Sequence, residues 1–235
     1  MRTQKAGPTA KTLLASLALV VAAGTLGACG APSSSHATAP SASATATAPG
    51  TPSAELMAKL VPSDARIIAN PAKPRTTLIL FTDYQCPYCA KMDTLIERAK
   101  KEYGSEVRIV VRNFPLPMHE NAPLAAKAVE AAAEQGALEK MGHLVFSKQA
   151  EWAKSTSGQA ATFTGYAREL GLNMDRFAKD FTSQAVATRV QRDLDDAKEL
   201  GLRGTPSVVL EGQLLQVDSS DYTTLKAPLD QVLGN

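Results

Sequence analysis

The chain has 235 residues with 44% hydrophobic content, and its 25 basic and 23 acidic residues give a formal net charge of +2. This length and composition predict one globular domain with a sizeable core, accompanied by further segments. Because no basic stripe accompanies the near-neutral balance, the composition excludes a nucleic-acid-binding protein.

Residues 1–28 have the pattern of an export signal. Three basic residues precede an apolar run over residues 13–26. A membrane-spanning helix needs about 20 apolar residues, so this shorter run favours a cleaved signal peptide. The run ends in Leu26-Gly27-Ala28-Cys29, which resembles the bacterial lipobox, where cleavage precedes the cysteine and the cysteine carries lipid. We therefore predict a signal peptide at residues 1–28 and a lipidated Cys29, with simple secretion as the alternative.

Residues 29–53 consist almost entirely of Ala, Pro, Ser and Thr. Such a segment cannot bury enough apolar surface to fold, so we expect a tether that begins at Cys29. The tether would hold a folded domain, residues 54–235, at the outer face of the cell membrane. Removal of residues 1–28 takes away three basic residues and no acidic residue, which changes the formal net charge from +2 to −1.

The first part of the folded domain alternates between helix and strand. An apolar run over residues 76–82 predicts a buried central strand, and Gly104 ends the helix that follows. Short connections predict that this strand and the next are parallel, in a βαβ unit. The expected elements are a helix at 54–60, strands at 66–69 and 76–82, a helix at 87–103 and a strand at 107–113.

A helical block and a short return to β structure complete the domain. Asn121 is expected to cap the first helix of the block, and a break is expected near Ser183. Glu211-Gly212 predicts a hairpin turn, and Pro228 predicts that the final helix starts late or bends. The expected elements are helices at 121–136, 137–152, 157–170 and 173–200, strands at 207–210 and 213–217, and a helix ending at Leu233.

The cysteines carry the strongest chemical signal. The lipobox accounts for Cys29 and leaves Cys86-Pro87-Tyr88-Cys89, which lies where a buried strand meets a helix. Unpaired N–H groups at the helix start stabilise a thiolate at Cys86, and Pro87 suits the first helical position. Cys89 returns to the same helix face and can attack a mixed disulfide formed at Cys86. We expect an exposed nucleophile, Cys86, with a low pKa, and a largely buried resolving thiol, Cys89.

A metal site is the alternative interpretation of the two cysteines. Zinc needs three or four protein ligands, whereas the histidines, His36, His119 and His143, are scattered and no second CxxC exists. A CxxC ring closes too small a loop to act as a structural staple, and export favours disulfide chemistry. The pattern therefore favours a redox pair over a metal site.

Three segments together resemble the bacterial DsbA-like thioredoxin-fold proteins. Residues 81–89, Phe-Thr-Asp-Tyr-Gln-Cys-Pro-Tyr-Cys, resemble the active-site segment of that family. Arg112-Asn113-Phe114-Pro115-Leu116, with His119 and Asn121, resembles the segment that leads into a helical insertion, expected here at about residues 118–202. Gly204-Thr205-Pro206 resembles the loop whose proline is cis and faces the active site. The resemblance covers about residues 55–235.

The resemblance implies a thioredoxin-like α/β fold (βαβ, then ββα) with a helical insertion between the two halves. It implies a thiol:disulfide oxidoreductase whose only redox group is the Cys86–Cys89 disulfide, with no further cofactor and no metal. Pro87, Tyr88, Thr205 and Pro206 would neighbour the reacting sulfurs.

Three functions remain open at this stage. The first hypothesis is a monomer that oxidises the thiols of exported proteins and is itself reoxidised by a quinone-linked membrane partner. Reduction or isomerisation of exported proteins is the second. A non-catalytic lipoprotein that binds thiols or metal is the third.

Leu80 is a departure from the family pattern. Relatives commonly have a buried acid six residues before the first cysteine, which is associated with proton transfer to the buried thiol. Its replacement leaves the proton route open and removes a charge that would disfavour the Cys86 thiolate. Among the other polar residues, Asp83 is expected to form local hydrogen bonds and His119 to be structural, while His143 and Trp152 are expected to pack in the core.

Overall fold

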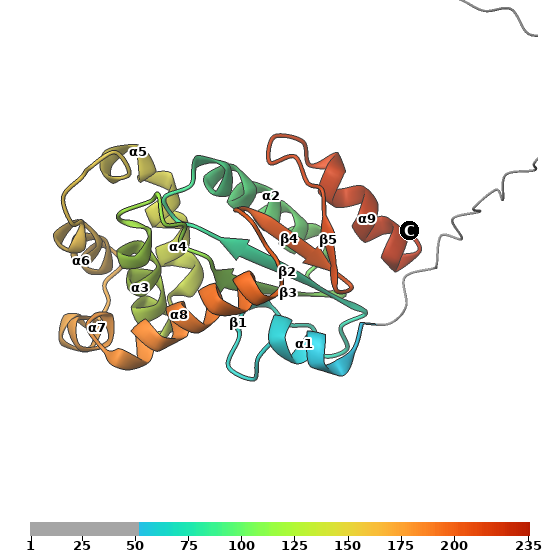
Figure 1. Ribbon diagram of the computed structural model, residues 1–235, viewed down its shortest axis with the longest axis horizontal. Helices are drawn as coiled ribbons and strands as arrows, with labels where there is room; N and C mark the ends of the chain where they lie inside the picture. Colours follow the sequence, from blue (N-terminus) through green and yellow to red (C-terminus); the bar gives the residue numbers. More distant parts are fainter. Residues whose placement is uncertain (1–51) are drawn as a thin grey trace, which may run out of the picture. The chain divides into compact units, whose positions relative to one another are not determined.

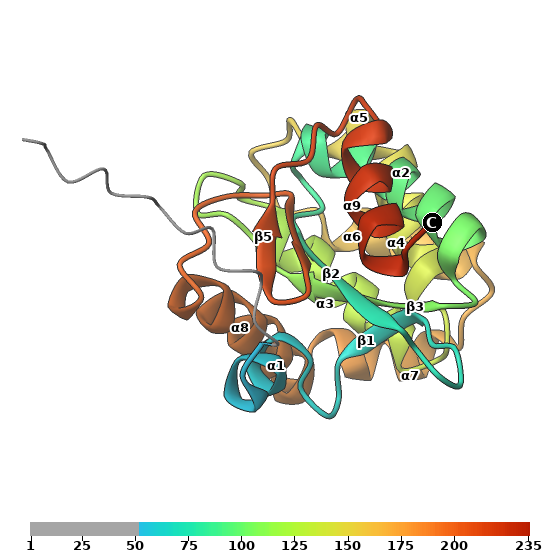
Figure 2. The ribbon, with the colours of Figure 1, turned by 90° about the vertical axis from the view of Figure 1, so that its right-hand side faces the viewer.

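The computed structural model describes residues 52–235, which form a five-stranded sheet with helices on both faces (Figures 1 and 2). The predicted signal peptide, Cys29 and all of the tether up to residue 51 lie outside the described residues. None of the helices from residue 52 onward has the length and apolar character needed to cross a membrane. The first half contains α1 (Ala54–Leu60), β1 (Arg66–Ala69), β2 (Thr76–Thr82), α2 (Pro87–Tyr103) and β3 (Val107–Asn113).

The strand order in the sheet is β1-β3-β2-β4-β5, with β4 at Ser207–Leu210 and β5 at Gln213–Leu215. The β2–β3 pair is parallel, as the βαβ prediction requires, and the other neighbouring pairs are antiparallel. At the centre, Leu80 of β2 is opposite Val111 of β3 and Val208 of β4. The α/β fold predicted from the sequence is therefore confirmed.

Alternation along β2 divides the hydrophobic core between the two faces of the sheet. Leu78 and Leu80 pack with residues of α2 and the C-terminal helix α9 (Thr223–Leu233). Ile79 and Phe81 pack on the opposite face with residues of α1 and α8 (Gln184–Glu199). Figure 2 shows these two helix pairs on opposite sides of the sheet. The central strand is buried from both sides, which explains its continuous apolar sequence.

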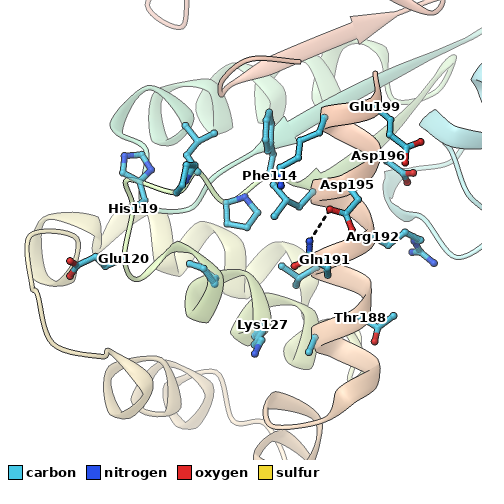
Figure 3. Close-up of a pocket in the computed structure, with 18 of the residues that line it drawn as sticks. Phe114, His119, Glu120, Lys127, Thr188, Gln191, Arg192, Asp195, Asp196 and Glu199 are labelled. Atoms are coloured by element: carbon cyan, nitrogen blue, oxygen red, sulfur yellow. Dashed lines mark hydrogen bonds between the residues drawn. The ribbon is translucent and has the colours of Figure 1, made fainter. Parts of the chain in front are cut away.

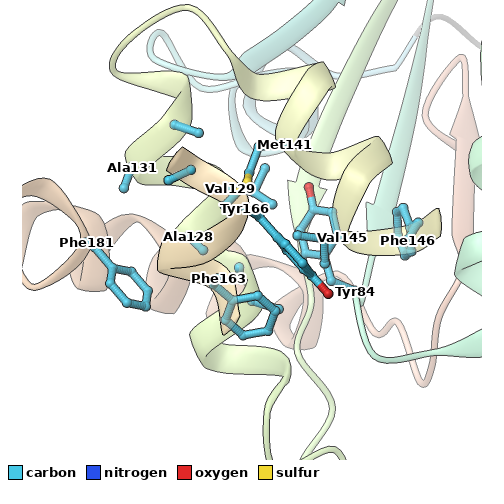
Figure 4. Close-up of a cluster of buried hydrophobic side chains, with 14 of the residues drawn as sticks. Tyr84, Ala128, Val129, Ala131, Met141, Val145, Phe146, Phe163, Tyr166 and Phe181 are labelled. Carbon is cyan, nitrogen blue, oxygen red and sulfur yellow. The ribbon is translucent and has the colours of Figure 1, made fainter. Parts of the chain in front are cut away.

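A helical block lies between β3 and β4. It consists of α3 (Ala122–Ala133), α4 (Leu138–Ser147), α5 (Gln149–Trp152), α6 (Ala160–Glu169), α7 (Met174–Phe181) and α8. The predicted break at Ser183 is confirmed, because its side chain accepts a hydrogen bond from Val186 N and caps α8. The block buries its own aromatic cluster around Phe163 and Tyr166, against which Tyr84 and Phe146 also pack (Figure 4).

Three local predictions were wrong. Asn121 stands before α3 but does not cap it, because its side-chain amide donates to Ser155 O instead. The final helix does not start late, because it begins at Thr223 and includes Pro228, with leucines buried on both sides of it. His143 is not a core residue, since 69% of its side chain is exposed. Trp152 is fully buried, as expected.

A buried ionic network joins the sheet to α8. Arg112 of β3 bonds to Asp193 (2.7 Å) and Asp196 (2.5 Å), and also donates to two carbonyl groups at the end of α1. Asn113 donates to Asp193 and to the buried Glu130 of α3. We call these residues, Arg112, Asn113, Glu130, Asp193 and Asp196, the Arg112 network. It fixes the helical block on the sheet next to the loop that follows β3.

Candidate functional site

The two cysteines lie where β2 leads into α2. Cys86 is the residue before the helix, and Pro87 occupies its first turn, where no hydrogen bond is lost. A tight turn precedes the helix, in which Cys86 N donates to Asp83 O (3.1 Å) and Gln85 N donates to Asp83 Oδ1 (2.7 Å). The backbone N–H groups of Tyr88 and Cys89, at the start of α2, act on the Cys86 sulfur.

The burial of Cys86 corrects the sequence prediction. Cys86 was expected to be exposed, but only 4% of it is accessible, compared with 0% for Cys89. The reason is tertiary packing over the helix start. The Cys86 sulfur lies 3.5 Å from the Thr205 carbonyl oxygen, and Gln149 of α5 donates to the Cys86 carbonyl oxygen (3.0 Å). Both cysteines are free thiols, and the neighbouring Tyr88 is exposed.

The surroundings of the two thiols shift their pKa values in opposite directions. The Cys89 thiol donates a hydrogen bond to the Cys86 sulfur and is the main reason that the pKa of Cys86 falls from 9.0 to about 6. Burial opposes this effect, while backbone N–H groups at the helix start and the Thr205 hydroxyl add to it. Burial raises the pKa of Cys89 well above its ordinary value. The arrangement therefore favours a thiolate at Cys86 and a protonated thiol at Cys89.

The loop before β4 completes the site. The Thr205–Pro206 peptide bond is cis, as the resemblance implied. The Thr205 hydroxyl is buried, has no nitrogen or oxygen partner among residues 52–235, and lies beside both sulfurs. The structure thus brings together Cys86, Cys89 and Thr205, which are far apart in the sequence.

Asp83 connects the cysteines to the loop after β3. Its backbone N–H points at the Cys89 sulfur at 3.5 Å, and its buried carboxylate accepts a hydrogen bond from Leu116 N (2.7 Å). His119 Nδ1 lies 2.8 Å from the same carboxylate oxygen. The local hydrogen bonding predicted for Asp83 is confirmed, but its pairing with His119 spans 36 residues and had no signal in the sequence.

The same loop forms one wall of the large cavity drawn in Figure 3, with a volume of about 900 Å³. Helix α8 forms the opposite wall. His119 lies at its edge, but neither cysteine lines it. Phe114, Pro115, Leu116 and Pro117 give this wall an apolar character. The cavity is therefore a neighbour of the thiol site and not part of it.

Within the described part of the chain, no group of three or more His, Cys, Asp or Glu side chains is arranged to hold a metal ion. Two cysteines alone do not complete a zinc site.

Comparison with known proteins assigns the family. Residues 66–231 match the family described as thioredoxin. The chain belongs to this family.

Solved structures with this fold cover about three quarters of the chain. A thioredoxin-like oxidoreductase from Silicibacter pomeroyi is 27% identical, with a TM-score of 0.61 over 76% of this chain and 98% of its own. BdbD from Bacillus subtilis is 18% identical, with a TM-score of 0.63 over 79% of this chain and 97% of its own. A periplasmic thioredoxin-like protein from Salmonella enterica is 20% identical, with a TM-score of 0.62 over 79% of this chain and 100% of its own. The last two similarities concern the fold alone.

The curated relatives include Na⁺/H⁺ antiporters called NhaA. The protein from Herminiimonas arsenicoxydans is 37% identical over 163 residues, which are 69% of this chain and 25% of the antiporter. NhaA 3 from Salinispora tropica is 33% identical over 160 residues, or 68% of this chain and 23% of the antiporter. The chain thus spans about a quarter of the length of these relatives. The ion transport stated in their names refers to those proteins and is not assigned to this chain.

Proposed function

We propose that the chain catalyses thiol–disulfide exchange with client polypeptides through Cys86 and Cys89, and that it oxidises client thiols. The observation that carries this proposal is the opposed environment of the two sulfurs. The pKa of Cys86 is lowered to about 6, mainly by the Cys89 thiol, while burial raises that of Cys89. An oxidised pair gains driving force when its reduced form is stabilised in this way.

Burial decides which sulfur a client attacks. Cys86 has 4% of its surface accessible and Cys89 has none, so a client thiolate reaches the Cys86 sulfur. The Cys86–Cys89 bond then breaks, and Cys89 leaves and takes up a proton. A second client thiolate attacks the client sulfur of the mixed disulfide. The client disulfide forms, Cys86 leaves as a thiolate, and two electrons have passed from the client to the pair.

The lowered pKa translates into a modest change of reduction potential. At pH 7, a pKa of about 6 instead of 9.0 stabilises the reduced pair about tenfold, or by about 1.4 kcal/mol. For a two-electron couple this raises the reduction potential by about 30 mV.

One observation favours client reduction as the second candidate function. The Cys86 pKa of about 6 lies closer to the value of about 7 known for thioredoxin than to about 3.5 for DsbA. The reduction potential of the protein, equilibrated with glutathione, tests the two directions. A value above that of protein disulfide isomerase, about −180 mV, would support client oxidation, whereas a value near −270 mV would assign the protein to reduction.

We also propose that the protein works outside the cytoplasm, anchored by lipid at Cys29, and that a quinone-linked membrane protein reoxidises it. The N-terminal sequence supports the anchor. The periplasmic origin of the Salmonella protein, which shares the fold, supports the compartment. Metabolic labelling with a radioactive fatty acid tests the anchor, since a Cys29→Ala variant should lose the label.

A further inference from the structure

The main chain of Asp83 contacts both cysteines. Its N–H points at the Cys89 sulfur at 3.5 Å, and its carbonyl oxygen accepts a hydrogen bond from Cys86 N (3.1 Å). Its carboxylate, at the other end of the residue, bonds to the loop after β3. Asp83 therefore connects this loop to the reacting pair, and the loop residue that holds its carboxylate also sets the place of its N–H.

His119 supplies the side-chain partner of this carboxylate. The Asp83 carboxylate has no accessible surface, so it depends on hydrogen bonds within the protein. Gln85 N donates to Oδ1 (2.7 Å), and Leu116 N and His119 Nδ1 donate to Oδ2 at 2.7 and 2.8 Å. Within residues 52–235, His119 is the only side chain that bonds to it. A buried carboxylate that loses such a partner is left poorly satisfied, and the turn that carries it shifts.

The Cys89 sulfur is the atom most sensitive to such a shift. Burial raises the pKa of Cys89 well above its ordinary value, and the Thr205 hydroxyl and the Asp83 N–H oppose this effect. Cys89 must act as a thiolate when Cys86 is bound to a client, because the thiolate and not the thiol attacks a disulfide. A hydrogen bond from a fixed N–H to a thiolate is charge-assisted and stronger than the same bond to a thiol. The Asp83 N–H is therefore worth most in the step that Cys89 performs.

The Cys86 sulfur has a different set of neighbours. The Cys89 thiol is the main group that lowers the pKa of Cys86, followed by backbone N–H groups of α2 and the Thr205 hydroxyl. The Thr205 carbonyl oxygen lies 3.5 Å from the same sulfur. Asp83 bonds to the backbone of Cys86 and not to its sulfur. A change at Asp83 should therefore affect the Cys86 attack less than the Cys89 attack.

The position of His119 makes its role separable from folding. It lies at the edge of the cavity in Figure 3, and 21% of its side chain is exposed. The loop has other attachments, since Phe114 N donates to Thr82 O (2.7 Å) and Asn121 N donates to Gln85 Oε1 (2.7 Å). Replacement of His119 should therefore leave the loop in place and remove its bond to Asp83.

We propose that His119 is a positioning residue for Cys89: its bond to the Asp83 carboxylate holds the Asp83 N–H on the Cys89 sulfur, where this N–H stabilises the attacking thiolate. The proposal rests on the function proposed above for the cysteine pair. In the mixed disulfide, the Cys89 thiol releases its proton to the solution, and its thiolate attacks the Cys86 sulfur. The Cys86–Cys89 bond forms, the bond from Cys86 to the client breaks, and the client leaves as a thiolate. Over the two steps, two electrons pass from the pair to the client disulfide, and client oxidation is the reverse.

The test uses a reagent that reports on each cysteine separately. Full-length protein with Cys29→Ala, which retains only Cys86 and Cys89, is reduced and mixed with 5,5′-dithiobis(2-nitrobenzoate) in a stopped-flow instrument. Cys86 attacks the reagent and releases one coloured thiolate, and Cys89 then attacks the mixed disulfide and releases the second. The first rate rises with reagent concentration and the second does not, so the two steps are identified in each trace.

For His119→Leu we expect the second phase to slow about tenfold, while the first phase changes less than about twofold. His119→Asn should bring the second rate back to within about threefold of the reference protein, because its amide can donate from the position of Nδ1. Glu120→Gln, a change in the exposed residue next along the loop, is the matched control and should leave both phases unchanged.

A double-mutant cycle tests whether His119 acts through Asp83. Asp83→Ala removes the carboxylate and should slow the second phase at least as much as His119→Leu does. Adding His119→Leu to Asp83→Ala should then slow this phase by less than about twofold more, since the bond is already gone. Independent, multiplying effects of the two changes would overturn the proposal.

A second phase of His119→Leu at the rate of the reference protein would also overturn the proposal. So would equal slowing of both phases, or a His119→Asn variant as slow as His119→Leu, because either marks a general role in packing. If His119→Leu does not fold, His119→Ala takes its place with the same expected rates, since a smaller side chain makes no new contact. Failure of the underlying function looks different, because the reference protein would then release no second thiolate.

Discussion

The Arg112 network lies at the end of β3, and the thiol site lies at the end of β2, the neighbouring strand. These two buried polar regions differ in how completely their hydrogen-bonding groups are paired. In the Arg112 network every buried side-chain nitrogen and oxygen has a partner within residues 52–235. At the thiol site, the buried Thr205 hydroxyl has no nitrogen or oxygen partner in this part of the chain, and the two cysteines remain free. A satisfied network specifies one packing arrangement, whereas unsatisfied groups are available to a proton, a water or a client. The comparison separates the region that stabilises the fold from the region that reacts.

The largest effect expected concerns the reactive region. Cys86→Ser should abolish exchange, because Cys89 has no accessible surface and cannot replace the lost nucleophile. Cys89→Ser should instead accumulate mixed disulfides with client peptides, which non-reducing electrophoresis and mass spectrometry detect. Exchange by the Cys86→Ser variant at an appreciable rate would assign the attack to Cys89 and reverse the two roles.

The next effect concerns the stabilising region. Arg112→Met leaves the buried Asp193 carboxylate and the partly exposed Asp196 carboxylate without their cation, which should cost about 3–5 kcal/mol in the free energy of unfolding. Urea titration measures this loss. Arg108→Met, which removes a half-buried arginine of the same strand that bonds to Asn70, is the control and should cost less than about 1 kcal/mol. An equal loss in both variants would remove the distinction between the network and the surface.

A pH effect should appear only in the reactive region. The folded pKa of Cys86, about 6, lies below its ordinary value of 9.0, so its thiolate stabilises the reduced protein at high pH, and this contribution is lost as the pH falls through about 6. Between pH 6 and 8, reduced protein should gain about 2 kcal/mol relative to Cys86→Ser. Denaturant unfolding at the two pH values measures the gain. A constant difference between the two proteins would show that the Cys86 pKa is not lowered.

The smallest effect expected is that of Thr205→Val. This change removes a hydroxyl beside both sulfurs and keeps the shape of the side chain, so the pKa of Cys86 should rise by less than about one unit. Thiolate absorbance near 240 nm follows this titration. A Thr205→Ser variant retains the hydroxyl and should keep the wild-type pKa, and a fall in the pKa of Thr205→Val would contradict the role given to the hydroxyl.

The fold and the cysteine pair could be predicted from the sequence because short local patterns of residues indicate both. The continuous apolar residues of β2, the glycine that ends α2 and the CxxC spacing lie within a few residues of the features they predict. The burial of Cys86 could not be predicted in this way. It depends on Gln149 and Thr205, which are 63 and 119 residues distant in the sequence.

The long-range polar pairs at the site and along α2 could not be predicted from the sequence either. Asp83 and His119 meet at the site across 36 residues, and further along α2 Asp93 and His143 meet across 50. Neither pair has a motif spacing, and His143 was expected in the core because it lies within an apolar helix. Only the packing of α4 against α2, and of the loop after β3 against the start of α2, brings these residues together.

The rate of alkylation of Cys86 as a function of pH tests the central claim most directly. Reduced protein is treated with iodoacetamide in short pulses between pH 4 and 10, and mass spectrometry of peptides separates modification of Cys86 from that of Cys89. The account predicts that Cys86 is modified first, with a midpoint at about pH 6, and that Cys89 resists modification throughout. A midpoint near pH 9 for Cys86, or earlier modification of Cys89, would contradict it.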